Sequence, residues 1–364
     1  MIVALAAAAL IVLAVVLFFR FFPAFGSRTS GEKLKVMQNL PNFNGKVFEN
    51  QITTNMDMNA SSIFSMLRDY MKGNPHRTPS SMVPVVPFQF GQPLGAEQAR
   101  VTWIGHSAFI LEIEGKTLLV DPMFGSAPTP FPWFGNKRFS KTLPFDIDSI
   151  PEVDAIIFSH DHYDHLDYDS FKKLKNKARR IFVPLGVSGH LERWGADPSK
   201  ISEHYWYDEI EFEGLKLVCA PARHFSGRSL TDRNSTLWCS WSFIGRYNKV
   251  FYSGDSGYGP HFKEIGEKYG PFDLTLMECG QYDERWAAIH MLPEETVQAH
   301  IDVKGRTLIP VHWAAFTLSF HDWNDPAERA HKEAKKHGVS ITLPRIGESV
   351  TVRDEVFPVE KWWH

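Results

Sequence analysis

The chain has 364 residues, of which 43% are hydrophobic and 22% are charged, a composition typical of a folded globular protein. Its formal net charge of −3 provides no basic field that could hold nucleic acid, so we expect no nucleic-acid partner. The three cysteines are odd in number and lack CxxC spacing, which argues against a disulfide framework. The length fits two domains or one large α/β domain with an extension.

An unbroken apolar run, IVALAAAALIVLAVVLFF, covers residues 2–19. As an α-helix it would be about 27 Å long, close to the hydrocarbon thickness of a bilayer. A cleavable signal peptide is the alternative, but no Lys or Arg precedes the run, and the run exceeds a typical signal core. We therefore predict an uncleaved, single-pass transmembrane anchor over residues 1–22. Because four cations follow the run, namely Arg20, Arg28, Lys33 and Lys35, the positive-inside rule places the rest of the chain in the cytoplasm.

Residues 23–94 are predicted to be a linker and an N-terminal extension. The stretch up to residue 60 is rich in Pro, Asn, Gly and Met and has no sustained hydrophobic period, as expected of a linker. In SSIFSMLRDYMK, residues 61–72, apolar side chains recur at helical spacing, and Ser61 or Ser62 can serve as the N-cap. We expect this helix either to dock on the main body or to lie on a membrane surface.

The main body, predicted over residues 95–364, consists of short strands interleaved with helices, which indicates an α/β layered fold. VTWIGHSAFILEIEGKTLLVDP predicts two strands joined by a tight Glu-Gly turn and ends near Asp121. A loop rich in Pro, Phe and Gly, residues 123–145, leads to the buried strand VDAIIFSH. SFKKLKNKARR predicts a helix, and IFVPLG predicts the next buried strand. Later strands are predicted in LKLVCAPARH, STLWCSWSFIG, KVFYSGDSG, FDLTLMECG and TLIPVHW, and later helices in PEETVQAHIDV and PAERAHKEAKKHG.

Potential metal ligands gather at the ends of these predicted strands. Four of them fill the pattern H-x-H-x-D-H in the segment FSHDHYDHLDY: His160, His162, Asp164 and His165. Three more follow other strands: His224, Asp255 and His312. Each residue alone could be a capping carboxylate or a histidine hydrogen-bonded to the backbone. Together they supply five imidazoles and two carboxylates, enough for two borderline-soft divalent ions with positions left open for water.

These motifs, taken in order, resemble the metallo-β-lactamase superfamily, and most closely its N-acylphosphatidylethanolamine phospholipase D-like branch. The segments that carry the resemblance are TWIGHSAFILEIEGKTLLVDP, FSHDHYDHLD, PARHFSGR, LWCSWSFIG, YSGDSGYGPHF, YGPFDLTLMECGQYDERW, HMLPEETVQAH and PVHWAAFTLS. They cover roughly residues 95–345. The resemblance implies an αββα sandwich, in which two sheets pack together and helices lie outside them.

The resemblance also implies a ligand set for two divalent metal ions. One ion would be held by His160, His162 and His224, the second by Asp164, His165 and His312, and Asp255 would bridge the two. Zinc is the expected metal from this ligand set, although iron or manganese can occupy such sites.

Three further residues receive supporting roles from the resemblance. Asp121 would orient the histidine loop from behind the ligands without touching a metal ion. His290 would line the site and serve as the catalytic candidate that protonates a leaving group or holds a phosphate. His106, in a GH element that this branch shares, is expected to be hydrogen-bonded in the interior rather than to bind metal.

The sequence therefore predicts a membrane-anchored, dinuclear metal-dependent hydrolase. The preferred activity is a phosphodiesterase of phospholipase D type that acts on N-acylphosphatidylethanolamine-like glycerophospholipids, with a membrane lipid as substrate. The alternative is a lactonase or a sugar-phosphate hydrolase of the same fold. A tRNA-processing nuclease is disfavoured by the charge balance. A scaffold without metal is disfavoured because every expected ligand position is filled, and no G-x-S-x-G elbow or Walker loop suggests a different chemistry.

Overall fold

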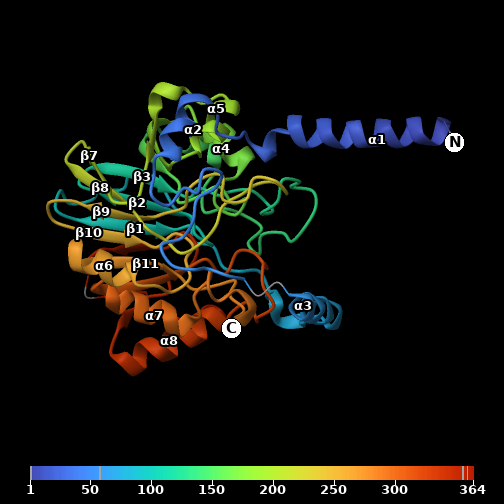
Figure 1. Ribbon diagram of the computed structural model, residues 1–364. Helices are drawn as coiled ribbons and strands as arrows, with labels where there is room; N and C mark the ends of the chain where they lie inside the picture. The colour runs from blue at the N-terminus through green and yellow to red at the C-terminus, as the bar shows by residue number, and fades with distance from the viewer. Residues whose placement is uncertain (1, 57–58, 355, 359) are drawn as a thin grey trace.

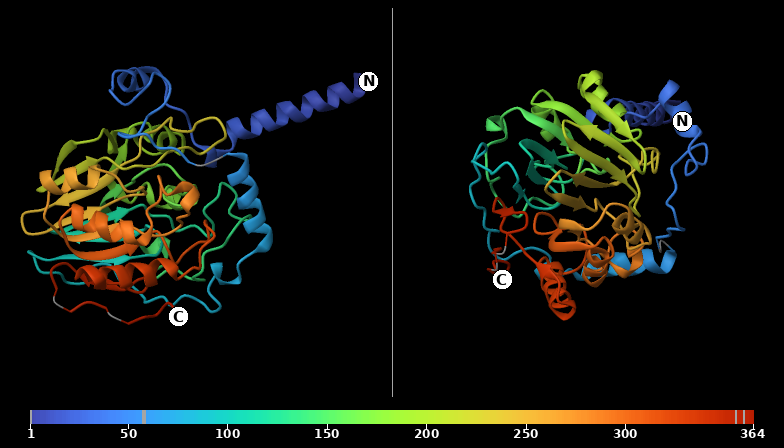
Figure 2. Two further views of the ribbon diagram at one scale, coloured as in Figure 1. Left: turned by 60° about the horizontal axis from the view of Figure 1, so that its bottom comes forward. Right: turned by 90° about the vertical axis from the view of Figure 1, so that its left-hand side faces the viewer.

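A computed structural model describes the chain except for residues 1, 57–58, 355 and 359, and it describes side chains from Leu5 onward (Figure 1). Two sheets pack face to face in the centre, and helices cover their outer faces (Figures 1 and 2). The predicted αββα sandwich is therefore confirmed.

The first sheet has the strand order β14-β1-β2-β3-β4-β5-β6. Its strands are β1 (Ala99–Trp103), β2 (Phe109–Ile113), β3 (Lys116–Val120), β4 (Val153–Ile157), β5 (Ala178–Pro184), β6 (Ile201–His204) and β14 (Ser349–Thr351). The β2–β3 hairpin turns at Glu114 and Gly115, whose φ angles are 48° and 75°. Two successive positive φ values fit a tight hairpin turn, so the predicted Glu-Gly turn is confirmed. From β3 to β6 the strands are parallel.

The second sheet has the order β13-β12-β11-β10-β9-β8-β7. Its strands are β7 (Asp208–Phe212), β8 (Leu215–Ala220), β9 (Ser240–Ile244), β10 (Lys249–Tyr252), β11 (Phe272–Glu278), β12 (Gly305–Val311) and β13 (Ser340–Ile341). Strands β10 to β13 are parallel, whereas β7 to β10 alternate in direction. The carboxyl ends of β8, β10, β11 and β12 therefore meet at one edge of this sheet, where side chains can converge.

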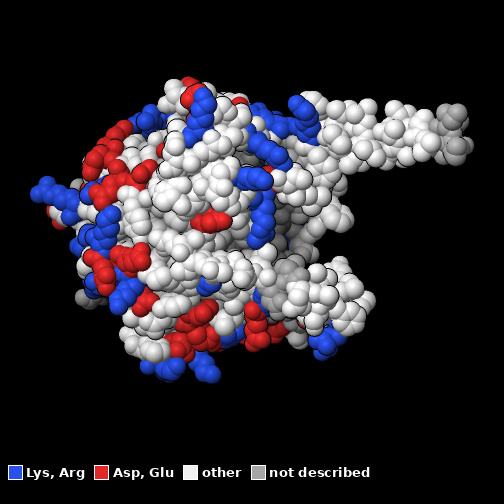
Figure 3. Space-filling model, in the orientation of Figure 1, with Lys and Arg blue, Asp and Glu red and all other residues white. Residues whose placement is uncertain are grey.

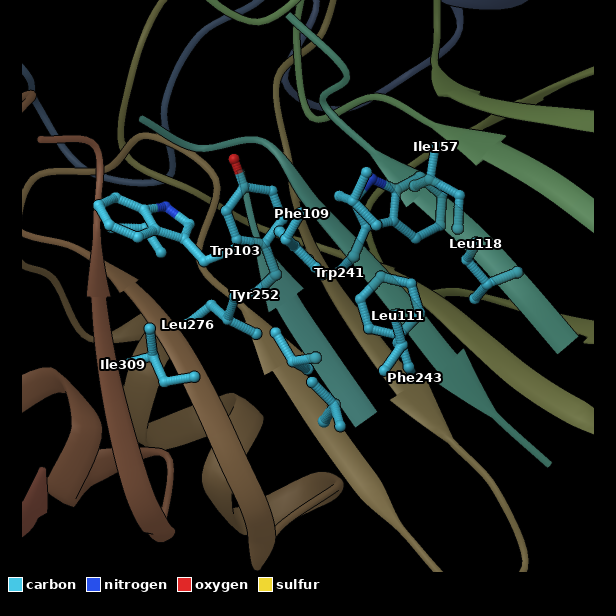
Figure 4. Packing of buried hydrophobic residues seen from close by; sticks show 14 of the residues in the cluster. Trp103, Phe109, Leu111, Leu118, Ile157, Trp241, Phe243, Tyr252, Leu276 and Ile309 are labelled. Carbon is cyan, nitrogen blue, oxygen red and sulfur yellow. The ribbon is translucent and has the colours of Figure 1, made fainter. Parts of the chain in front are cut away.

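Aromatic and branched side chains fill the space between the sheets (Figure 4). The first sheet contributes Trp103, Phe109, Leu111, Leu118 and Ile157, and the second contributes Trp241, Phe243, Tyr252, Leu276 and Ile309. The indole of Trp241 donates a hydrogen bond of 2.9 Å to the carbonyl of Phe158, at the end of the first sheet. The sheets are thus held together by apolar burial and by a polar contact beside the histidine motif.

Helices cover both outer faces of the sandwich. Helices α4 (Tyr168–Leu174) and α5 (Ser188–Arg193) lie on the first sheet, and α6 (His261–Lys268), α7 (Pro293–Asp302) and α8 (Asp325–His337) lie on the second. Short 3-10 turns are η1 (Pro23–Phe25), η2 (Pro75–Arg77), η3 (Ile147–Ser149), η4 (Pro198–Lys200) and η5 (Glu284–Trp286). The predicted helix SFKKLKNKARR ends early, because Ala178–Arg180 pair with β4 as the start of β5.

The expected linker contains regular structure and contributes to the core. Helix α2 (Gly31–Gln38) lies within it, and α3 (Ala60–Lys72) follows at the predicted place. The side chains of Met37, Phe43 and Phe48 are buried in the cluster between the sheets. Residues before the main body therefore stabilise the fold as well as connect it.

Helix α1 (Ile2–Phe21) extends away from the body (Figure 1). Across the part of the chain that the structure describes, no helix combines the length and apolar character needed to cross a membrane. The predicted transmembrane anchor, and the single-pass topology with a cytoplasmic body that depended on it, are not supported.

The close packing at the end of β11 provides a test of the fold. A Cβ atom on Gly280 would lie 2.1 Å from the carbonyl oxygen of His312, which is backbone and cannot swing aside. We expect Gly280→Ala to lower the free energy of unfolding by roughly 1–3 kcal/mol, the usual cost of overpacking. Gly189→Ala is the control, because its Cβ would meet its nearest neighbour at 3.6 Å. Urea denaturation that gives both variants wild-type stability would contradict this packing.

Candidate metal centre

The predicted ligands converge where the carboxyl ends of strands from both sheets meet. The H-x-H-x-D-H loop follows β4 of the first sheet, and Asp121 follows β3. From the second sheet, His224 follows β8, Asp255 follows β10, and His312 directly follows β12. Each strand is apolar and buried over its last residues, so the chain leaves the core at the point where its polar side chains begin.

The first group comprises His160, His162, His224 and Asp255, whose potential ligand atoms all lie within 4.8 Å of one another. Nε2 of His160 lies 2.9 Å and Nε2 of His224 lies 3.2 Å from Nδ1 of His162. The Oδ2 atom of Asp255 is 3.8 Å from Nε2 of both His160 and His224. Three imidazoles and a carboxylate at this spacing can hold one metal ion.

The second group shares the same carboxylate. Oδ2 of Asp255 lies 3.0 Å from Nε2 of His165 and 3.1 Å from Nε2 of His312. Oδ2 of Asp164 lies 3.6 Å and 3.2 Å from the same two nitrogens. Asp164, His165, His312 and Asp255 can therefore surround a second ion, with Asp255 placed between the two groups.

Groups behind the ligands fix the orientation of their rings. Asp121 is fully buried and accepts hydrogen bonds from Nδ1 of His165 at 2.8 Å and from the hydroxyls of Ser159 and Tyr252. Nδ1 of His224 lies 3.0 Å from the carbonyl of Ile289. These contacts leave Nε2 of His165 and of His224 to face the centre.

His106 is also buried here, with its Nε2 2.9 Å from Oδ2 of Asp164. Burial lowers the pKa of His106 to about 3, so its ring is neutral and can donate a hydrogen bond to this carboxylate. The contact matches the expectation of interior hydrogen bonding, although His106 lies near enough to belong to the second group.

The protonation of the two groups differs. Burial holds the pKa of His160 and of His224 well below the usual histidine value, so these neutral rings can offer lone pairs. Burial would also lower the pKa of His312, but Asp255 and Asp164 raise it to about 10. The two carboxylates thus stabilise the protonated form of His312. A bound metal ion would balance the charge of the carboxylates in place of this proton, and the ring would then be neutral.

Two buried atoms provide an independent test of whether a metal fits. Nε2 of His165 and Oδ1 of Asp255 are buried and lack a hydrogen-bond partner among the described residues. Buried polar atoms are almost always satisfied, and a buried imidazole nitrogen and carboxylate oxygen without partners in this cluster fit the binding of a cation. The donor set, imidazole with carboxylate, suits zinc, iron or manganese.

Two residues that contact the site, Glu278 and Asn50, were not predicted from the sequence. Glu278, at the end of β11, is fully buried and contacts Nδ1 of His290, and burial raises the pKa of its carboxyl. Asn50, in the expected linker, exchanges hydrogen bonds with the backbone N–H and C=O of His224. The signal available for Glu278 was an acidic residue that closes an apolar strand, whereas nothing local marks Asn50.

A cleft of about 220 Å³ opens onto the centre. Its polar wall includes His162, Asp164, Asp255, His290 and His312, so the structure brings His290 to the predicted ligands. Its apolar wall is made by Met56, Phe225, Trp286, Ile289 and Leu318. Trp286 belongs to η5, and Leu318 lies in the loop after β12. The cleft can therefore present a polar centre to a molecule that also has apolar parts.

Comparisons with known proteins agree with this fold. The family named Beta-lactamase superfamily domain matches residues 116–313. The chain is 42% identical over 274 residues to an uncharacterised protein of Mycobacterium tuberculosis, covering 74% of this chain and 72% of that protein. It is 35% identical over 229 residues to N-acyl-phosphatidylethanolamine-hydrolyzing phospholipase D 1 of Caenorhabditis elegans, covering 60% of this chain and 64% of that protein.

A similar solved structure is a metallo hydrolase from the archaeon Ignicoccus hospitalis. The superposition covers 71% of this chain and 100% of the archaeal chain, with a TM-score of 0.56 and 21% sequence identity. At this identity the likeness concerns the fold alone.

The shared carboxylate provides a test of the site. Asparagine keeps the shape of Asp255 but loses the charge that balances a cation, so we expect Asp255→Asn to weaken metal binding by at least about 10–100-fold. Metal content after dialysis measures this loss, and circular dichroism verifies the fold. Asp148→Asn, at an exposed carboxylate in η3, should retain the metal. Equal metal content in the two variants would show that Asp255 is not a ligand.

Proposed function

Because the chain belongs to the β-lactamase superfamily and is a metal-dependent hydrolase, we propose that it is a phosphodiesterase of phospholipase D type acting on N-acylphosphatidylethanolamine-like glycerophospholipids. The observation that carries this proposal is the position of Asp255, whose carboxylate contacts both groups of potential ligands and lies beside a further histidine, His290. We also propose that residues 95–364 form the catalytic unit, since every proposed ligand lies within them.

The proposed cofactor is a pair of zinc ions. His160, His162 and His224 would hold one, Asp164, His165 and His312 would hold the other, and Asp255 would contact both. When bound, such a pair supplies an activated water at neutral pH and stabilises the oxygens of a phosphoryl displacement. Each group contains imidazole nitrogens and a carboxylate at ligand spacing, which supports this assignment.

His290 is the proposed proton donor to the leaving group. Its Nδ1 contacts the buried carboxylate of Glu278, which also accepts a hydrogen bond from the backbone N–H of Ser256 at 2.9 Å. A carboxyl group held in this way fixes the orientation of the ring, so that Nε2 of His290 can exchange a proton with a bound molecule. The ring of His290 stacks on that of His312 at 5.2 Å between centroids, so the proton donor stands directly beside a proposed ligand.

Two observations support a lipid substrate. The relative from Caenorhabditis elegans bears the name of an N-acyl-phosphatidylethanolamine-hydrolyzing phospholipase D. The cleft has a polar wall at the proposed ligands and an apolar wall that includes Phe225, Trp286 and Leu318. This combination suits a phosphodiester that carries acyl chains. In the proposed reaction, water adds to phosphorus and the bond from phosphorus to the head-group oxygen breaks. The departing oxygen takes a proton, and the products are a phosphatidate and an N-acylethanolamine.

Hydrolysis in isotopically labelled water tests the proposal. With N-acylphosphatidylethanolamine as substrate, we expect the label in the phosphatidate and none in the released alcohol, because the bond that breaks is the one at phosphorus. Mass spectrometry of the lipid products measures this, with Asp255→Asn as the inactive control. Label in a free fatty acid would identify an acyl esterase. Turnover of lactones or sugar phosphates without turnover of any phospholipid would identify the alternative hydrolase of this fold.

A further inference from the structure

Helix α3 turns its apolar side chains toward solvent. Ile63 is 51% exposed, Phe64 is 67% exposed and Met71 is 69% exposed, and Leu67 and Tyr70 are also exposed. Ser62 is the one buried residue that the structure describes within this helix. An amphipathic helix of a globular protein normally buries its apolar face against the core, so the orientation of α3 is the reverse of the usual one.

Polar contacts fix this reversed orientation. Nη1 of Arg285 donates hydrogen bonds to Oγ of Ser65 at 2.8 Å and to Oδ2 of Asp69 at 2.9 Å. The side chain of Arg285 is 15% exposed and is paired on its other side with Asp283. Rotating α3 to bury its apolar face would break these bonds and leave the guanidinium short of partners. The apolar face is therefore held outward by the protein itself.

A second apolar element lies at the same end of the molecule. In the loop that carries Phe131, Trp133 and Phe134, the last two side chains are 72% and 71% exposed. Phe131 packs on Phe22 of the segment after α1, with 5.3 Å between ring centroids. Figures 1 and 2 show α1 and α3 at the end opposite β7 and β8. This loop therefore continues the apolar surface that begins on α1.

The loop and α3 are joined through the segment that borders the metal cleft. Asn136 donates a hydrogen bond of 2.6 Å to the carbonyl of Thr317, whose hydroxyl donates to the carbonyl of Arg77 just after α3. The next residue, Leu318, lines the cleft. On the other side, Arg285 is followed by Trp286, which also lines the cleft. The two apolar elements are thus attached to the rim of the cleft.

The exposed charged residues of α3 and of the loop are mostly Lys and Arg. Helix α3 carries the exposed cations Arg68 and Lys72, and its one acid, Asp69, is engaged by Arg285. The segment 123–145 contains the exposed cations Lys137 and Lys141 and no Asp or Glu, whereas its Arg138 packs over the ring of Phe316. In Figure 3, the surfaces of α1 and α3 are largely uncharged, and Lys and Arg side chains lie on the body between them. Exposed apolar side chains bordered by cations complement an anionic phospholipid surface.

We propose that α3 and residues 129–142 form a docking surface for a phospholipid bilayer that contains anionic lipid. With both elements seated on the bilayer, the mouth of the metal cleft lies next to the lipid head groups. The docking itself depends on the two elements alone, whereas its use for substrate capture rests on the proposed function.

A dye placed on α3 tests the docking in the full chain. The three native cysteines are buried, so Phe64→Cys can be labelled selectively with an environment-sensitive fluorophore. We expect vesicles of phosphatidylcholine and phosphatidylglycerol to shift its emission to the blue, and acyl-chain nitroxide lipids to quench it. Glu211→Cys, at an exposed position on β7, is the matched control and should show neither change. A position-specific probe is needed because α1 alone could bring the chain to vesicles.

Other results of the same experiment would overturn the proposal. A dye at position 64 that stays water-exposed on vesicles would show that α3 does not dock. A dye already shielded without vesicles, to an extent that rises with protein concentration, would assign the surface to a second copy of the chain. The double variant Arg68→Glu with Lys72→Glu should reduce quenching on anionic vesicles, and unchanged quenching would exclude the charge contribution.

Activity measurements separate this proposal from the proposed function. Leu67→Ser should reduce hydrolysis of phospholipid in vesicles several-fold while leaving hydrolysis of a soluble phosphodiester, bis(p-nitrophenyl) phosphate, unchanged. Equal loss on both substrates would show that α3 acts on the site and not through the bilayer. If the protein hydrolyses no phospholipid, the proposed substrate is wrong, and the fluorescence measurement still decides whether α3 docks.

Discussion

The buried carboxylate of Asp255 is the group on which the arrangement of the site depends. Its Oδ2 lies within 3.8 Å of a ring nitrogen of four histidines, which come from both sheets. Burial would raise the pKa of Asp255, but His165 and His312 hold it well below its usual value, so the carboxylate is ionised. An ionised group inside the protein is costly unless positive charge stays beside it. The buried anion is therefore stable only while the loops that carry the histidines stay packed around it.

Contacts between the two sheets, behind the ligands, hold the histidine loops in place. Asp121 ends the β2–β3 hairpin of the first sheet, and the hydroxyl of Tyr252, at the end of β10 in the second sheet, donates to it at 2.6 Å. The same carboxylate also receives the N–H of Ser159 at 2.7 Å. Below this polar layer, Trp241 and its neighbours fill the space between the sheets (Figure 4). The apolar core thus sets the distance between the sheets. Because Asp121 is hydrogen-bonded to both sheets and to the histidine loop, it fixes the position of that loop relative to them.

Local patterns in the sequence predicted an α/β layered fold with candidate ligands at the ends of its strands, because polar residues that follow buried strands must emerge at one edge of a sheet. The αββα sandwich was implied by the resemblance to a known family. Contacts distant in sequence were not predictable in this way. Glu278 looked like an ordinary acid at a strand end, and its role depends on His290 across a loop. Asn50 meets His224 only after folding. The Lys- and Arg-rich stretch after α4 has high helix propensity, yet pairing with β4 makes it β5, because tertiary contacts override propensity.

Anomalous diffraction from crystals of the zinc-loaded protein tests the central claim most directly. The account predicts two peaks about 3.5–4 Å apart, one beside His160, His162 and His224 and the other beside Asp164, His165 and His312. Each peak should lie about 2.0–2.2 Å from its ligand atoms, and both should contact Asp255. A single peak, or peaks that leave Asp255 without a metal contact, would contradict the account.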